Sequence, residues 1–89
     1  MRAIISVVGK DTVGILAKVS SLCAASQVNV VDVTQTILQD MFVMVMMVDI
    51  SKMTVTFSDF SDEVTGYGKD AGLVIHVMHE DIFNSMHKI

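Results

Sequence analysis

The sequence predicts an α+β domain in which a four-stranded antiparallel sheet carries two helices on one face and ends in a short C-terminal helix. Four short stretches rich in apolar and β-branched residues predict strands, and two stretches with apolar residues every three or four positions predict helices. Their order is strand, helix, strand, strand, helix, strand, which is the ferredoxin-like βαββαβ arrangement. At 89 residues, the chain is expected to form one domain over residues 1–89.

The first strand and the first helix are predicted from contrasting patterns. Residues 2–8 are apolar at nearly every position, which predicts a strand buried on both faces. Residues 14–26 show helical spacing, with Ile15 and Val19 on the stripe that faces the sheet. Cys23 lies on the same stripe, and we interpret it as a small core residue and not as a nucleophile.

The second and third strands differ in polarity. Residues 29–38 are mixed and rich in threonine, which is typical of a sheet edge or of a surface beneath a partner. Strict alternation assigns Val30 to the same face as Asp32. Residues 42–50 are apolar on both faces, so this strand is expected to be central.

The second helix is predicted over residues 56–66, which continue a complete amphipathic stripe. Thr56, with Asp59 three residues later, resembles a capping box at its start. Gly66 and Gly68 are expected to end the helix, because glycine is the usual residue after a helical C-terminus.

The last strand is predicted over residues 72–79, and acidic residues Glu80 and Asp81 then begin the short terminal helix. His76 and His79 should point to opposite faces of the strand, so they cannot share a metal. A cation beside His79, Glu80 and Asp81 is an open alternative, but a solvated corner is the simpler interpretation. We therefore predict no metal site.

The overall composition predicts a homo-oligomer, most simply a dimer. Hydrophobic residues make up 52% of the chain and the mean hydropathy is +0.59, which is high for a small monomer. Two helices would cover one face of the sheet and leave apolar residues bare on the other. A second chain is the expected cover.

Several functional classes are disfavoured. The net charge of −4 and six scattered basic residues argue against nucleic acid as a partner. No apolar stretch approaches the roughly 20 residues that span a membrane, no signal peptide is recognised, and the single cysteine fits a reducing compartment, so we expect a cytoplasmic protein. No residue pattern supports nucleophilic or acid–base chemistry, so we expect neither an enzyme nor a cofactor.

A short polar connection between the first strand and the first helix carries glycine at each end, Gly9 and Gly14. Such a junction exposes backbone N–H groups and the positive end of a helix dipole, which suit a carboxylate. Valine at position 14 is expected to cost at most about 1 kcal/mol of stability through helix propensity. On local chemistry alone, the favoured alternative is that Asp11 or Thr12 simply caps the helix.

The element order and this turn together resemble the ACT domain, most closely the small stand-alone ACT proteins of bacteria and archaea. The resemblance covers essentially the whole chain. It rests on three stretches: Val7-Val8-Gly9-Lys10-Asp11 followed by Gly14-Ile15-Leu16, Asn29-Val30 with Asp32 and Gln35 after it, and Phe42-Val43-Met44 in a Met-rich strand.

This resemblance implies an ACT-type sandwich that binds an amino acid or a similar small molecule for regulation, usually in a dimer or larger assembly. Relatives often hold the ligand between the turn of one subunit and the second-strand edge of its neighbour. Val13 stands where relatives usually have proline, so the turn is expected to be less rigid. By position, the candidate ligand-binding residues are Asp11, Val13, Gly14, Ile15 and Leu16 on the turn, and Asn29 and Asp32 across from it.

Two functions remain open at this point. The first is a non-enzymatic sensor in which an effector held by both subunits favours one arrangement, which a third protein reads. The alternative is a ligand-free interaction module that dimerises or docks on a partner enzyme or regulator. Asp32 and Gln35 are ambiguous in the same way, because either could contact a ligand or only satisfy the edge strand.

Overall fold

The computed structural model describes residues 1–10 and 13–86, and it confirms the predicted fold class. Within these residues, no helix combines the length and the apolar character needed to cross a membrane. The elements in chain order are β1 (Arg2–Lys10), α1 (Ile15–Ala25), β2 (Asn29–Leu38), β3 (Met41–Asp49), α2 (Phe57–Ala71), β4 (Leu73–His79) and α3 (Glu80–Met86).

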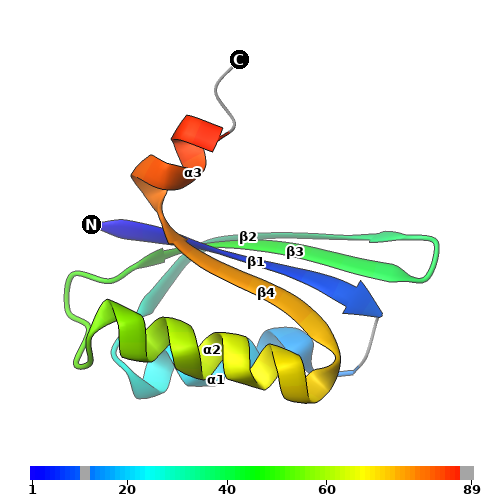
Figure 1. Ribbon diagram of the computed structural model, residues 1–89, viewed down its shortest axis with the longest axis horizontal. Coiled ribbons are helices and arrows are strands. Elements are labelled where there is room, and N and C mark those ends of the chain that lie inside the picture. Colours follow the sequence, from blue (N-terminus) through cyan, green and yellow to red (C-terminus); the bar gives the residue numbers. More distant parts are fainter. Residues whose placement is uncertain (11–12, 87–89) are drawn as a thin grey trace.

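The four strands form one antiparallel sheet in the order β2-β3-β1-β4. Helices α1 and α2 lie on one face of this sheet, and the short α3 lies on the other (Figure 1). We call these the helix face and the open face. Strand β3 is central, as predicted, and so is β1. The prediction that residues 2–8 are buried on both faces was wrong for the open face, where only Ile4 of β1 is buried.

The main core lies between the helix face and the two long helices. Alternate residues of β1 and β3 point into it, as period-two alternation requires. Burial raises the pKa of the Cys23 thiol to about 11, so it stays protonated and packs as an apolar group, as predicted. The fully buried members of this core are Ala3, Ile5, Val7, Ile15, Val19, Cys23, Met44, Met46, Val48, Phe60 and Val64.

Strand β2 contains a bulge that the alternation pattern did not predict. Val30 pairs with Val48 and therefore faces the helices, whereas the next paired residue, Asp32, lies opposite Met47 on the open face. The prediction that Val30 and Asp32 share a face was wrong, because the extra residue at Val31 resets the alternation. Oδ1 of Asp32 accepts a hydrogen bond from the N–H of Val33 at 2.8 Å, next to this irregularity.

Helix α2 begins as predicted but ends later. Thr56 is its N-cap, with Oγ1 accepting from the N–H of Asp59 at 3.1 Å. The predicted end at Gly66 or Gly68 was wrong, because the helix continues to Ala71 and Gly72, at φ 74°, is the C-cap. The pattern was misleading because Gly68 serves packing: a Cβ there would lie 2.7 Å from Cγ1 of Ile75 on β4.

The two histidines of β4 lie on opposite faces, as predicted. His79 stacks on Phe57 with ring centroids 4.2 Å apart, which places it on the helix face. His76 pairs with Ser6 on the open face. Among residues 1–10 and 13–86, no group of three or more His, Cys, Asp or Glu side chains is placed to hold a metal ion.

Helix α3 covers one end of the open face. The guanidinium of Arg2 pairs with the carboxylate of Glu80 through two hydrogen bonds, Nε to Oε2 at 2.8 Å and Nη2 to Oε1 at 2.6 Å. Phe83 lines the same small hollow as Ile4, which is only 2% exposed although it lies outside the main core. Among residues 1–10 and 13–86, no other helix lies over the open face, in agreement with the predicted one-sided layer of two helices (Figure 1).

Candidate functional site

The turn before α1 has the backbone geometry that only glycine adopts easily. Gly14 is the N-cap at φ 87°, and its carbonyl accepts the first helical hydrogen bond from the N–H of Lys18 at 2.9 Å. No side chain of the described residues caps this helix. Asp11 and Thr12, which the sequence nominated as a ligand contact and as possible caps, lie outside the described residues. The first-turn N–H groups thus sit at the positive end of the helix without a side-chain cap from the described chain.

The space outside this turn is open. A Cβ at Gly14 would meet nothing within 4 Å, and the side chain of Val13 is fully exposed. Ile15, in contrast, is buried in the core, and Leu16 packs partly against it. A ligand at the turn could therefore reach Ile15 only through its backbone. The prediction that valine at position 14 costs at most about 1 kcal/mol of stability is therefore too low, because β-branched residues are strained at a positive φ.

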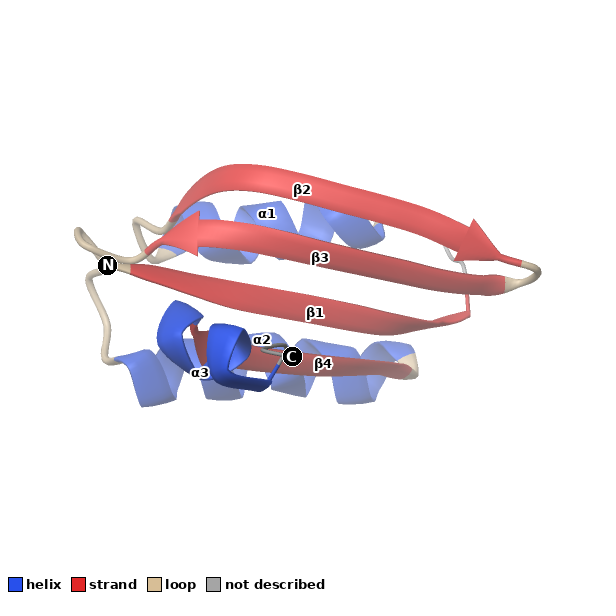
Figure 2. Ribbon diagram, turned by 90° about the horizontal axis from the view of Figure 1, so that it is seen from above, coloured by secondary structure: helices blue, strands red, loops and turns tan. Residues whose placement is uncertain are grey.

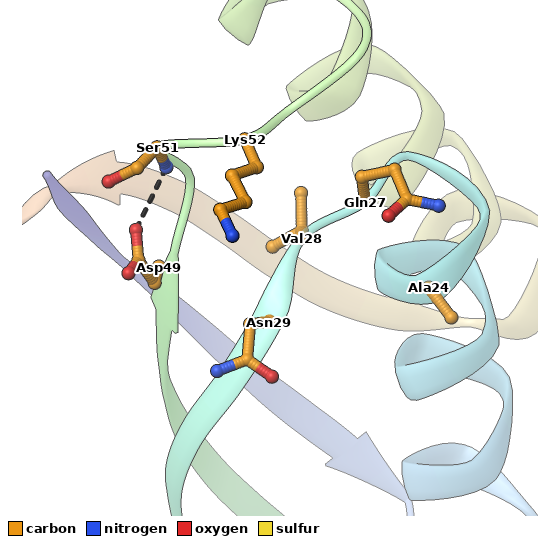
Figure 3. A pocket seen from close by; sticks show the side chains of 7 residues that line it. All are labelled: Ala24, Gln27, Val28, Asn29, Asp49, Ser51 and Lys52. Carbon is orange, nitrogen blue, oxygen red and sulfur yellow. Dashed lines mark hydrogen bonds between the residues drawn. The ribbon is translucent and has the colours of Figure 1, made fainter.

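Asn29 lies at the rim of a hollow of about 580 Å³ at the other end of the sheet (Figure 3). The hollow brings together an amide, a carboxylate, a hydroxyl and an ammonium group, which are the groups that recognise a small zwitterion. Figure 3 shows Lys52 extending toward the space between Asp49 and Val28. The lining residues are Ala24, Gln27, Val28, Asn29, Asp49, Ser51 and Lys52.

Asp49 supplies the negative charge in this hollow. The Ser51 hydroxyl and the Ser51 N–H, which donates to Oδ1 at 2.8 Å, hold the pKa of Asp49 below its usual value. The amino group of Met1 donates to Oγ of Ser51 at 2.9 Å and lies 4.0 Å from Oδ1 of Asp49. The carboxylate is therefore ionised at neutral pH and already lies near one ammonium group.

The two halves of the predicted site lie at opposite ends of one chain. Asn29 is in the cross-strand row of Asp49 and Arg2, at the start of β1, whereas the turn follows Lys10 at the end of β1. Eight residue steps along an antiparallel strand span about 26 Å. Asp32 is in the row of Met47 and Ile4, two steps nearer to the turn, but its side chain lines the hollow beside α3 on the open face. A single chain brings neither Asn29 nor Asp32 to Gly14.

A further hollow, near the turn, was not predicted from the sequence. The hairpin of β2 and β3 extends beyond the first turn of α1 (Figure 2), and it carries a hollow of about 510 Å³. Gln35 had been considered as a ligand contact, but Ile37 had not. Pairing of Ile37 with Phe42 places it on the helix face, which it shares with Val33 and Gln35. The lining residues are Gln35, Thr36, Ile37 and Phe42.

Comparison with known proteins gives one consistent family. A model of the ACT domain matches residues 2–77. A UPF0237 protein of Listeria innocua is 48% identical over 89 residues, with all of both chains covered, and a UPF0237 protein of Pyrobaculum aerophilum is 46% identical over 87 residues, covering 98% and 97%. A solved structure, an ACT domain protein from Streptococcus pneumoniae, has a TM-score of 0.80 and 36% identity over 93% of both chains.

Proposed function

Because the chain belongs to the ACT domain family, we propose that it is a regulatory module that binds a small amino-acid-like effector between two copies of itself. One observation carries this proposal. The turn at Gly14 and the polar rim at Asn29 have complementary chemistry, but they lie about eight residue steps, or about 26 Å, apart on one chain. A second copy can bring one half to the other.

The edge strand β2 suggests how two copies would meet. It ends the sheet on one side, with β3 as its neighbour on the other. Antiparallel pairing of two β2 strands about a two-fold axis would set the Asn29 end of one copy beside the Leu38 end of the other. The turn at Gly14 lies at that second end of the sheet. Such a dimer would form two equivalent composite sites.

Each composite site would have a distinct partner for each end of an α-amino acid. The effector carboxylate would bind the first-turn N–H groups of α1, where Gly14 leaves the approach open. Its ammonium would bind the side-chain oxygen of Asn29 and the ionised Asp49 of the second copy. Val13 and the backbone of Leu16 would line the approach, and Asp11 would contribute from the same turn.

The proposed mechanism is linkage between binding and subunit arrangement. An effector held by both copies stabilises one arrangement by its differential affinity, and a protein partner in the cytoplasm then distinguishes the two arrangements. The role needs neither catalysis nor a cofactor.

A ligand-free interaction module is the second candidate, and one observation favours it. Val13 stands in place of the proline usual in relatives, so the φ angle of the turn is not fixed at this position. Ordering the turn around a ligand would therefore cost more conformational entropy. In that case the chain would still dimerise but would respond to no small molecule.

A thermal-unfolding screen against the twenty amino acids distinguishes the two candidates. We expect at least one amino acid, at a hundred times its Kd, to add about 2.7 kcal/mol to the free energy of unfolding, which for a domain of this size raises Tm by roughly 10 °C or more. Sedimentation equilibrium should give a dimer or larger species at micromolar concentration. A dimer with no Tm shift would support the interaction module, and a mass near 9.7 kDa would remove both proposals.

A further inference from the structure

The open face carries an exposed apolar surface at the end away from α3. Lys10, Met41 and Leu38 form one cross-strand row, and Val8 pairs with both Val43 and Val74, so all six residues share this face. Val74 is 58% exposed, and Leu38 and Met41 are also exposed. We call this surface the distal patch: Val8, Lys10, Leu38, Met41, Val43 and Val74.

Helix α3 has a second apolar side that its own sheet does not bury. Phe83 lines a hollow with Ile4 and so faces the sheet beneath it. Ile82 and Met86 are four residues apart, which places them together on the helix surface. Both are exposed, Met86 by 67%. Because α3 has apolar side chains on two sides, it is suited to lie between its own sheet and a second apolar surface.

We propose that a second copy of this chain docks on the open face, so that α3 of each copy lies on the distal patch of the other. A two-fold axis parallel to the sheet and perpendicular to the strands reverses the strand direction of the second copy. Helix α3 begins where β4 ends, beside the start of β1, and the distal patch lies around the end of β1 (Figure 1). The rotation therefore superposes the two features, and both contacts form together.

The dimensions and the charges favour a second copy over another protein. A helix packs at about 8–10 Å from its neighbour, so the two α3 helices would fill a layer between two facing sheets. Asp81 is exposed at the start of α3, and Lys10 is exposed in the distal patch. The rotation therefore places opposite charges near each other twice. This interface uses side chains of the open face, including Leu38 of β2, but not the backbone edge of β2, so together with the effector dimer it would build a tetramer.

Charge reversal tests the proposed interface by sedimentation velocity over a concentration series. Lys10→Glu and Asp81→Lys should each weaken one association step at least tenfold, because each sets like charges against each other across the interface. The double variant should recover most of that loss. Val74→Glu should abolish the step without changing α3. Val55→Glu, at another exposed valine in the segment before α2 and not in the sheet, should leave the step unchanged.

The wild-type protein should show two association steps, one through the β2 edge and one through the open face. These variants should remove only the step through the open face. A wild-type protein with only one step that Val74→Glu leaves intact would overturn the proposal. If the loss of association free energy in the double variant equals the sum of the losses in the two single variants, the assigned pairing of Lys10 with Asp81 is overturned. Circular dichroism and Tm of each variant confirm that the fold is retained.

Discussion

Replacing Gly68 by valine is expected to destabilise the protein by about 3 kcal/mol, because added volume in a packed helix–sheet contact forces the backbone or its neighbours to move. A Cβ at Gly68 would lie 2.7 Å from Cγ1 and 2.9 Å from Cδ1 of Ile75, and 3.1 Å from the backbone oxygen of Leu73. The backbone oxygen cannot turn away as a side chain can. Helix α2 would have to separate from β4, and the buried Ile75 would lose its cover.

Gly66→Val is the matched control, two residues earlier in the same helix. A Cβ at Gly66 meets nothing within 4 Å, so valine there should be neutral or slightly stabilising through helix propensity. Urea denaturation of the two variants measures the difference. By chain length, the total stability is roughly 4–13 kcal/mol, so a 3 kcal/mol loss is a large fraction of it. Equal midpoints for the two variants would contradict the close approach of α2 to β4.

Gly14→Val is expected to abolish effector binding, with at least a hundredfold rise in Kd. The added branched side chain would occupy the open approach to the first-turn N–H groups of α1. It also carries a stability cost of about 1–3 kcal/mol, because a non-glycine residue at φ 87° is held in a sparsely populated region. Isothermal titration with the amino acid found in the screen measures the binding, and urea denaturation measures the cost.

Gly72→Val is the control that distinguishes the effect of backbone strain at positive φ from the effect of a side chain that blocks the ligand. Gly72 has a similar φ of 74° and also has open space around its Cβ, but it caps the end of α2. It should lose a similar amount of stability and keep its affinity for the effector. Gly14→Asn is a milder companion, since asparagine tolerates positive φ better and still places a side chain in the approach. Tight binding by both Gly14 variants would mean that the ligand site lies elsewhere.

The fold was predictable because its signals are local. Periodicity along the chain distinguishes a strand from a helix, and the residues of β3 alternate between a buried face and a largely half-buried face. The bulge at Val31 was not predictable, because an extra residue in one strand leaves no mark in its own sequence. Gly68 was misread because its neighbour Ile75 approaches only in the folded protein, and a glycine needed for contact looks the same as a glycine that ends a helix.

The candidate site was predictable only in part, for the same reason. The turn at Gly14 is one continuous stretch, so its backbone chemistry follows from the sequence. Asp49, Ser51 and Lys52 are about twenty residues beyond Asn29 and reach it only because β2 pairs with β3. Family resemblance nominated Asn29 but not these neighbours.

A mixing experiment tests most directly the claim that the effector site is shared between two copies. Gly14→Val and Asn29→Ala should each abolish binding as a homodimer, since every composite site would then lack one half. Unfolding and refolding them together in equal amounts would make about half of the dimers mixed, each with one intact site, so binding should return to about one quarter of the wild-type site number. Titration that recovers about a quarter of the sites at wild-type affinity supports the account. Titration that recovers none, from a mixture shown to contain mixed dimers, contradicts it.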